Sequence, residues 1–197
     1  MASKFSYYKI YKPYQMLSQF TPEPNKLSLK DLGFTFQKDV YPVGRLDYNS
    51  EGLLLLTNDN VLKTRLLEPK YAHQREYYVQ VDESITWEAI AQLENGVEIG
   101  GYKTKKAIVK KIEEPLLPER YPPIRYRKNI PTSWISIVLT EGKNHQVRKM
   151  TAKVGFPTLR LVRVRIENIS LGSLQPGDVV ELSQDEISTL KKVIYVR

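Results

Sequence analysis

An acidic residue in a polar turn, followed by a run of leucines, is the feature that most constrains the fold of this chain. Asp47 stands in the turn, and residues 53–56 are all leucine. A short apolar run bounded by turn residues is typical of a strand that is buried on both faces. Gly44 and Gly52 flank the turn, and glycine can adopt the backbone angles that a sharp change of direction needs. We therefore predict that Asp47 is held on a rigid support, which suits a catalytic group.

The charge of the chain predicts an anionic partner. Its 197 residues include 30 lysines and arginines against 22 aspartates and glutamates, a formal net charge of +8. This balance favours polyanions such as RNA, DNA or an anionic membrane surface. The longest apolar run is too short to cross a bilayer, and the first residues lack the apolar core of a signal peptide. We therefore expect a cytoplasmic protein with no membrane partner.

The absence of cysteine excludes several kinds of catalytic chemistry. Without cysteine there are no disulfides, thiolate nucleophiles or cysteine-containing zinc sites. The chain has only two histidines, His73 and His145, which disfavours a histidine metal site or a histidine-led triad. Catalysis must then depend on carboxylate, Tyr, Lys, Arg or hydroxyl groups, and this directs attention to Asp47.

The order of the expected elements favours an α+β fold. Strands are predicted near residues 5–10, 53–56, 76–81, 107–112 and 134–139, and helices near residues 28–33, 61–67, 86–93 and 144–154. Asp59 is expected to cap the second helix, and Trp87 to lie on the apolar face of the third. Because the elements mix without a strict βαβ rhythm, we predict a single domain, residues 1–197, around a central antiparallel or mixed sheet.

Basic residues are concentrated in two regions. Residues 142–165 contain several lysines and arginines and no acidic residue. Residues 113–131 form a proline-rich insertion, which is either a solvated loop or a flap that grips RNA. The insertion contains Arg120, Arg125, Arg127 and Lys128. Each lysine in the first region is either solvated or in contact with phosphate, because phosphate contact requires only a cation within reach.

Several motifs, in order along the chain, resemble those of one enzyme family. They lie at residues 11–18, 44–59, 75–79, 141–150 and 161–166, and include Gly-Arg-Leu-Asp at 44–47 and His-Gln-Val-Arg at 145–148. Together they resemble the RsuA family of pseudouridine synthases, which modify ribosomal RNA. The likeness is greatest to the short E-type enzymes of the large subunit, without a separate N-terminal S4-type RNA-binding domain. It implies a two-lobed fold with a basic active-site cleft. One departure is Glu-Asn at residues 167–168, where the family usually has Gly.

The resemblance implies roles for individual residues. Asp47 corresponds to the catalytic aspartate, and Arg148 would lie beside it and keep its carboxylate ionised and oriented. Tyr77 would stack on the target uracil, which must be flipped out of the RNA, although a strand tyrosine can equally be structural. Arg45 would contact phosphate or fill the space left by the base. The other predicted RNA contacts are Lys12, Lys143, His145, Lys149, Lys153 and Arg163, of which His145 is alternatively a structural histidine.

The reaction implied by the resemblance is the isomerisation of uridine to pseudouridine, without a cofactor or a metal. The N1–C1′ bond is cleaved, the uracil rotates, and it rejoins the ribose through C5. Asp47 could attack the ring, attack C1′ or remove the C2′ proton. We expect the protein to be a monomer. Its expected partner is 23S rRNA, with 16S rRNA or transfer RNA as alternatives.

Two other functions compete with this interpretation. The first is an RNA-binding or ribosome-assembly factor without catalytic activity, which the presence of Asp47, Tyr77 and Arg148 together disfavours. The second is a hydrolase that pairs Asp47 with Glu51 or Asp59, and it requires both carboxylates in one pocket. A strand through residues 53–56 would carry Asp59 away from Asp47, which disfavours the hydrolase.

Overall fold

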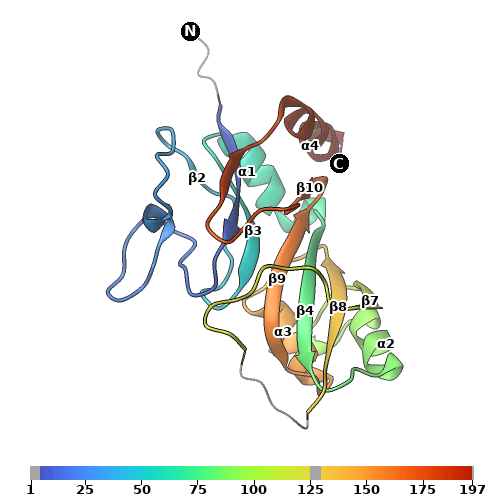
Figure 1. The fold of residues 1–197 in the computed structure, drawn as a ribbon. Coiled ribbons are helices and arrows are strands. Elements are labelled where there is room, and N and C mark those ends of the chain that lie inside the picture. The colour runs from blue at the N-terminus through green and yellow to red at the C-terminus, as the bar shows by residue number, and fades with distance from the viewer. Residues whose placement is uncertain (1–4, 125–129, 197) are drawn as a thin grey trace. The chain divides into compact units, whose positions relative to one another are not determined.

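The structure, a computed structural model, describes residues 5–124 and 130–196 (Figure 1). The chain divides into two compact units. Unit 1 comprises Met1–His73 and Arg163–Arg197, and unit 2 comprises Gln74–Val162. The chain returns to unit 1 within strand β9 (Thr158–Ile166).

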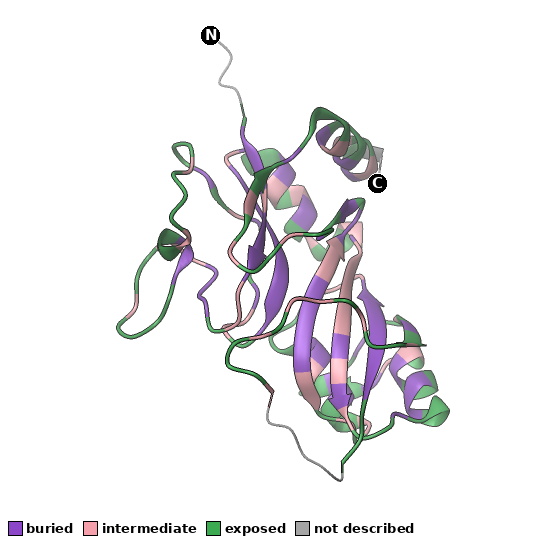
Figure 2. Ribbon diagram, viewed as in Figure 1, coloured by how far each residue is buried: buried purple, intermediate pink, exposed green. Residues whose placement is uncertain are grey.

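The sheet of unit 1 is organised around the buried strand β3 (Glu51–Thr57). β1 (Tyr7–Lys12) lies between β3 and β11 (Val179–Glu181) and is antiparallel to both. β2 (Tyr41–Pro42) also pairs with β3, and β10 (Ile169–Ser170) pairs with the end of β9. Every residue of β3 is buried, which Figure 2 shows in purple. The prediction of a strand buried on both faces at residues 53–56 is therefore confirmed.

Two short 3₁₀ helices and helix α1 lie in the first part of unit 1. They are η1 (Leu29–Leu32), α1 (Asn60–Leu67) and η2 (Pro69–Tyr71). Asp59 caps α1, because its Oδ1 accepts a hydrogen bond from the Leu62 N–H at 3.0 Å. Its Oδ2 accepts another from the Tyr7 hydroxyl at 2.8 Å. This confirms the predicted cap and gives Asp59 a structural role, which further disfavours its pairing with Asp47 in a hydrolase.

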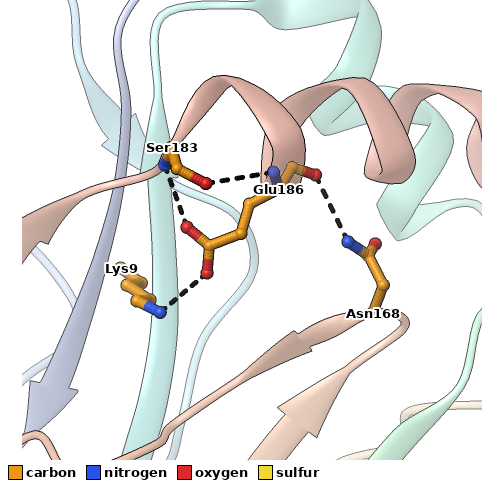
Figure 3. Close-up of polar contacts among 4 residues, drawn as sticks. All are labelled: Lys9, Asn168, Ser183 and Glu186. Carbon is orange, nitrogen blue, oxygen red and sulfur yellow. Dashed lines mark hydrogen bonds and ion pairs between the residues drawn. The ribbon is translucent and has the colours of Figure 1, made fainter.

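Helix α4 (Gln184–Val196) is anchored to the sheet of unit 1 through Glu186 (Figure 3). The carboxylate of Glu186 accepts hydrogen bonds from Lys9 Nζ at 2.8 Å and from the Ser183 N–H at 2.9 Å. Its backbone oxygen accepts a bond from Asn168 Nδ2 at 3.2 Å. Burial raises the pKa of Glu186, but the bonds from Lys9 and Ser183 outweigh burial and lower the pKa below its ordinary value. The first turn of α4 is thereby tied to β1 and to the turn before β10.

The turn between β9 and β10 retains a glycine-like conformation without glycine. Glu167 has φ 47°, in the left-handed region that favours glycine and costs other residues about 1 kcal/mol or more. Its carboxylate lies 3.0 Å from Nδ1 of His73, and both side chains are buried. The departure from the family pattern at this position therefore preserves the tight turn, and the contact with His73 offsets part of the strain.

Unit 2 is a sheet with two helices packed on its apolar core. β8 (Thr132–Leu139) lies between β4 (Arg75–Asp82) and β7 (Ile108–Ile112) and is antiparallel to both. The helices are α2 (Trp87–Asn95) and α3 (Gln146–Lys153), and β5 (Glu98–Ile99) with β6 (Tyr102–Lys103) forms a small hairpin. Side chains of the strands and of both helices, including Leu93, Ile135 and Met150, share one buried cluster. The combination of helices and strands in the two units confirms the α+β class.

Two sequence predictions about the helices of unit 2 are wrong in detail. Trp87 is 71% exposed and does not lie on the buried face of α2. Residues three apart in a helix differ in direction by about 60°, so residues six apart differ by about 120°. The side chain of Trp87 therefore points about 120° away from that of Leu93, which is buried. Helix α3 begins at Gln146 and not at residue 144. It begins later because His145 has φ 52°, a left-handed conformation that cannot belong to the helix.

The described part of the proline-rich insertion contains no helix or strand, as expected of a loop. Arg160, a buried residue, binds this loop: its guanidinium donates to Pro118 O at 2.8 Å. Arg120 Nε donates to Pro122 O at 2.9 Å. The predicted phosphate contacts at Arg125, Arg127 and Lys128 lie outside the described residues.

Candidate active site

Asp47 is half-buried in a turn that is anchored on β3. The Val43 N–H donates to Leu55 O at 2.7 Å, and the Ser50 N–H closes the turn on Asp47 O at 3.0 Å. Gly44 has φ 75°, and a Cβ on it would lie only 2.9 Å from a Leu67 methyl group. The backbone conformation therefore favours glycine before the turn, and a larger residue would also have to displace the Leu67 methyl group. The expected rigid support for the carboxylate is present.

A second segment of unit 1, residues 13–18, holds the turn on both sides of Asp47. The hydroxyl of Ser18 donates to Leu46 O at 2.9 Å and accepts from the Leu46 N–H at 3.0 Å. On the other side, the Gln15 N–H donates to Tyr48 O at 2.9 Å. The residues immediately before and after Asp47 are thus both hydrogen-bonded to this segment.

Lys12 stabilises the same segment from inside the unit. It has no exposed surface, and its Nζ donates to Pro13 O at 2.8 Å and to Met16 O at 2.7 Å. Burial lowers the pKa of Lys12 from its ordinary 10.5 to about 7. The carboxylates of Glu51 and Asp47 act in the opposite direction and raise the pKa. Lys12 is therefore close enough to Asp47 for each charge to affect the other.

Two of the predicted RNA contacts lie in the interior of unit 1. Besides Lys12, Arg163 is buried, with its Nε donating to Leu53 O at 2.7 Å. A cation with almost no exposed surface cannot reach a phosphate without rearrangement, so these positions do not fit the predicted contacts. Arg45 differs from them, because it is exposed next to the turn, with its guanidinium 3.3 Å from Gln19 Oε1. Its position is consistent with a phosphate contact.

Hydrogen bonds fix the backbone that leads into α3 in unit 2. The side chain of Gln146 is buried, donates to Glu141 Oε1 at 2.7 Å, and accepts from the Lys143 N–H at 2.9 Å. Glu141 Oε1 also accepts from the Lys105 N–H at 2.9 Å. Arg148 is half-buried in the first turn of the helix. The predicted RNA contacts Lys143, His145, Lys149 and Lys153 are all exposed.

Tyr77 lies on β4 opposite Ile137 of β8. Its ring is half-buried and packs against the core of unit 2. This packing agrees with the structural alternative for Tyr77. The exposed part of the residue leaves area on which a base could stack.

The predicted site residues divide between the units. Unit 1 contains Asp47 and Arg45, and unit 2 contains Tyr77, Arg148 and the exposed cations of residues 143–153. The contact between Asp47 and Arg148 stays a prediction. Sequence reasoning gave no role to Ser18 or Gln146, although both lie within the motifs. Ser18 bonds to a residue 28 positions away, and no local pattern reveals such a partner.

Comparison with known proteins identifies the family. The family described as RNA pseudouridylate synthase matches residues 6–153, which is most of the chain. The chain belongs to the RNA pseudouridylate synthase family. It is therefore an RNA pseudouridine synthase, an isomerase, and the motif resemblance is confirmed.

Curated relatives of this pseudouridine synthase match over most of its length. "Ribosomal large subunit pseudouridine synthase E" of Vibrio parahaemolyticus is 48% identical over 171 residues, which cover 87% of this chain and 71% of the relative. The protein of the same name in Xanthomonas campestris pv. campestris is 47% identical over 169 residues, covering 84% of this chain and 89% of that one. A solved structure, "Crystal structure of pseudouridylate synthase", has a TM-score of 0.78 at 23% identity and covers 95% of this chain and 74% of its own. It shows the same fold.

Two negative observations apply to the part of this synthase that the structure describes. Residues 5–124 and 130–196 contain no helix with the length and apolar character needed to cross a membrane. Within the same ranges, no group of three or more His, Asp or Glu residues is placed to hold a metal ion.

Proposed function

We propose that this pseudouridine synthase converts a specific uridine of 23S rRNA to pseudouridine, with Asp47 as the catalytic carboxylate. The main support for 23S rRNA as the substrate is the 47–48% identity to enzymes named for the large ribosomal subunit, over 84–87% of this chain. The Asp47 turn supports the catalytic role, since the carboxylate is half-buried and the backbone on both sides of it is held by hydrogen bonds, which pre-organises it for reaction.

The reaction breaks the N1–C1′ bond and forms a C5–C1′ bond, so atoms are conserved within the nucleotide. N1 gains a proton, and the hydrogen on C5 leaves to solvent. Asp47 acts as a nucleophile or a base, and it must be ionised for either role. The uridine must first leave the base stack, and Tyr77 would then stack on the flipped uracil. Arg148 would orient the carboxylate of Asp47 with its planar guanidinium.

The exposed cations on and before α3 would bind the RNA backbone next to the flipped nucleotide. Phosphate contacts of this kind position the RNA and do not read its sequence. Lys143, Lys149 and Lys153 are exposed and belong to a region without acidic residues. Selection of the uridine would then depend on the shape of the folded RNA around it.

Asp47→Asn tests the catalytic role. The amide keeps the size of the side chain and removes its charge, so isomerisation should fall below detection while folding and RNA affinity stay close to wild type. Turnover is measured as tritium released from C5-labelled 23S rRNA. Asp39→Asn is the matched control, since Asp39 is exposed in unit 1 and its φ of 62° is a conformation that asparagine accepts. Wild-type turnover in Asp47→Asn would refute the assignment.

The choice of RNA is tested separately. Pseudouridines are mapped in 23S rRNA, 16S rRNA and transfer RNA from cells with and without the gene. We expect a single 23S position to lose its modification and to regain it with the wild-type protein but not with Asp47→Asn. Loss confined to 16S rRNA or transfer RNA would contradict the 23S target and leave the catalytic assignment in place.

A further inference from the structure

We propose that Ser18 is a positioning residue for the reaction, which holds the backbone at Asp47 so that the carboxylate meets the uridine in the reactive geometry. The inference rests on the proposed catalytic role of Asp47. Ser18 belongs to the segment after β1, and it does not reach the reacting atoms. It acts through the peptide group that joins Leu46 to Asp47.

The hydroxyl of Ser18 both donates a hydrogen bond to one residue, Leu46, and accepts one from it. It donates to Leu46 O at 2.9 Å and accepts from the Leu46 N–H at 3.0 Å. Leu46 O belongs to the peptide that includes the backbone nitrogen of Asp47. Ser18 and Leu46 are both buried, at 3% and 6% exposed, so water cannot replace the hydroxyl without entering the interior of unit 1.

The segment that carries Ser18 is itself fixed at several points. The Leu17 N–H donates to Leu27 O at 2.8 Å, and Lys12 Nζ binds Met16 O. The Gln15 N–H holds Tyr48 O on the other side of Asp47. Loss of the Ser18 hydroxyl would therefore release one side of the turn and leave the other side attached. We expect Asp47 to shift or rotate while unit 1 stays folded.

Such a shift affects the chemical step more than it affects binding. A misplacement of about 1 Å between reacting groups can reduce a rate about 100-fold. Ser18 has almost no exposed surface, and the exposed lysines assigned to RNA, Lys143, Lys149 and Lys153, belong to unit 2. Ser18→Ala should therefore lower kcat about 10- to 100-fold and change KM and RNA affinity by less than about threefold.

The chain offers a matched control in Ser133 of unit 2. This serine is 8% exposed, donates to Glu83 O at 2.9 Å and accepts from the Ile85 N–H at 2.9 Å. Like Ser18, it donates to a backbone oxygen and accepts from a backbone N–H, but neither of its partners is next to a predicted site residue in the sequence. Ser133→Ala should lower the melting temperature by an amount comparable to Ser18→Ala and leave kcat within about twofold of wild type.

Single-turnover tritium release from a 23S rRNA fragment, RNA affinity and thermal melting are measured for wild type, Ser18→Ala, Ser18→Thr, Ser133→Ala and Asp47→Asn. Ser18→Thr keeps the hydroxyl and should recover most of the rate lost in Ser18→Ala. A wild-type rate in folded Ser18→Ala, together with an inactive Asp47→Asn, would overturn the positioning role alone. An active Asp47→Asn would overturn both this inference and the proposed catalytic assignment.

If Ser18→Ala does not fold, Ser18→Cys tests the positioning role of Ser18 instead. A thiol forms longer and weaker hydrogen bonds than a hydroxyl but nearly preserves the volume of the side chain. A reduced kcat with unchanged KM in folded Ser18→Cys supports positioning, and a wild-type kcat overturns it.

Discussion

Replacing Lys12 with methionine should change how the stability of the protein depends on pH. Lys12 is fully buried, and burial lowers its pKa to about 7 from the ordinary 10.5 that an unfolded chain would show. Methionine is unbranched and flexible, so it can occupy the space of the lysine side chain without the charge. The variant also loses the bonds to Pro13 O and Met16 O. Between pH 8 and 9.5 the folded protein makes these bonds with a neutral amine throughout, so their loss does not vary over this range.

Whether the free energy of unfolding rises or falls with pH depends on how many protons the folded and the unfolded protein bind. Below pH 7 Lys12 is protonated in both states, and the folded state carries the full cost of a buried charge. Between pH 7 and 10.5 the folded protein has released this proton and the unfolded chain keeps it, so stability rises with pH. The slope for one proton is at most about 1.4 kcal/mol per pH unit. From pH 8 to 9.5, wild type should gain about 2 kcal/mol relative to Lys12→Met.

The measurement is the free energy of unfolding in urea, for both proteins, at pH 6, 8 and 9.5. Subtracting the unfolding free energy of the variant from that of wild type removes the contribution of all groups that titrate equally in both proteins. Lys30→Met, which removes an exposed lysine of unit 1, controls for the general loss of one positive charge. A difference between wild type and Lys12→Met that stays constant from pH 8 to 9.5 would refute the reasoning. Lys12 would then remain protonated, with its charge compensated by Glu51 and Asp47.

Further predictions concern catalysis and RNA binding. Arg148→Met should abolish measurable turnover and Arg148→Lys restore only part of it, because a lysine lacks the planar fork that orients a carboxylate; wild-type turnover in the methionine variant would contradict this. Tyr77→Ala should reduce the single-turnover rate more than Tyr77→Phe if stacking is its main role, and equal losses would instead indicate that the hydroxyl transfers a proton. Neutralising Lys149 and Lys153 together should reduce the slope of log affinity against log salt by up to about 1.4, and an unchanged slope would assign both to the solvated surface.

Features that depend on residues close together in the chain could be predicted from the amino-acid sequence. The leucines at 53–56 predicted the buried strand β3, and Asp59 predicted the start of α1, since caps and short apolar runs act over a few residues. The Gly-Arg-Leu-Asp motif likewise located the Asp47 turn, because Gly44, three residues earlier, has a positive φ that favours glycine. The family followed from the order of such motifs, which the match over residues 6–153 confirmed.

The burial of particular side chains and the contacts between distant residues became clear only from the folded structure. Lys12 and Arg163 look like surface cations in the sequence, yet both lie inside unit 1, where distant segments enclose them. Trp87 looks like a core residue and is exposed, because the rotation of α2 against its sheet selects other positions. Ser18 reaches Leu46 across 28 residues. Contacts of this kind arise from packing between remote segments, so their geometry exists only after the chain has folded.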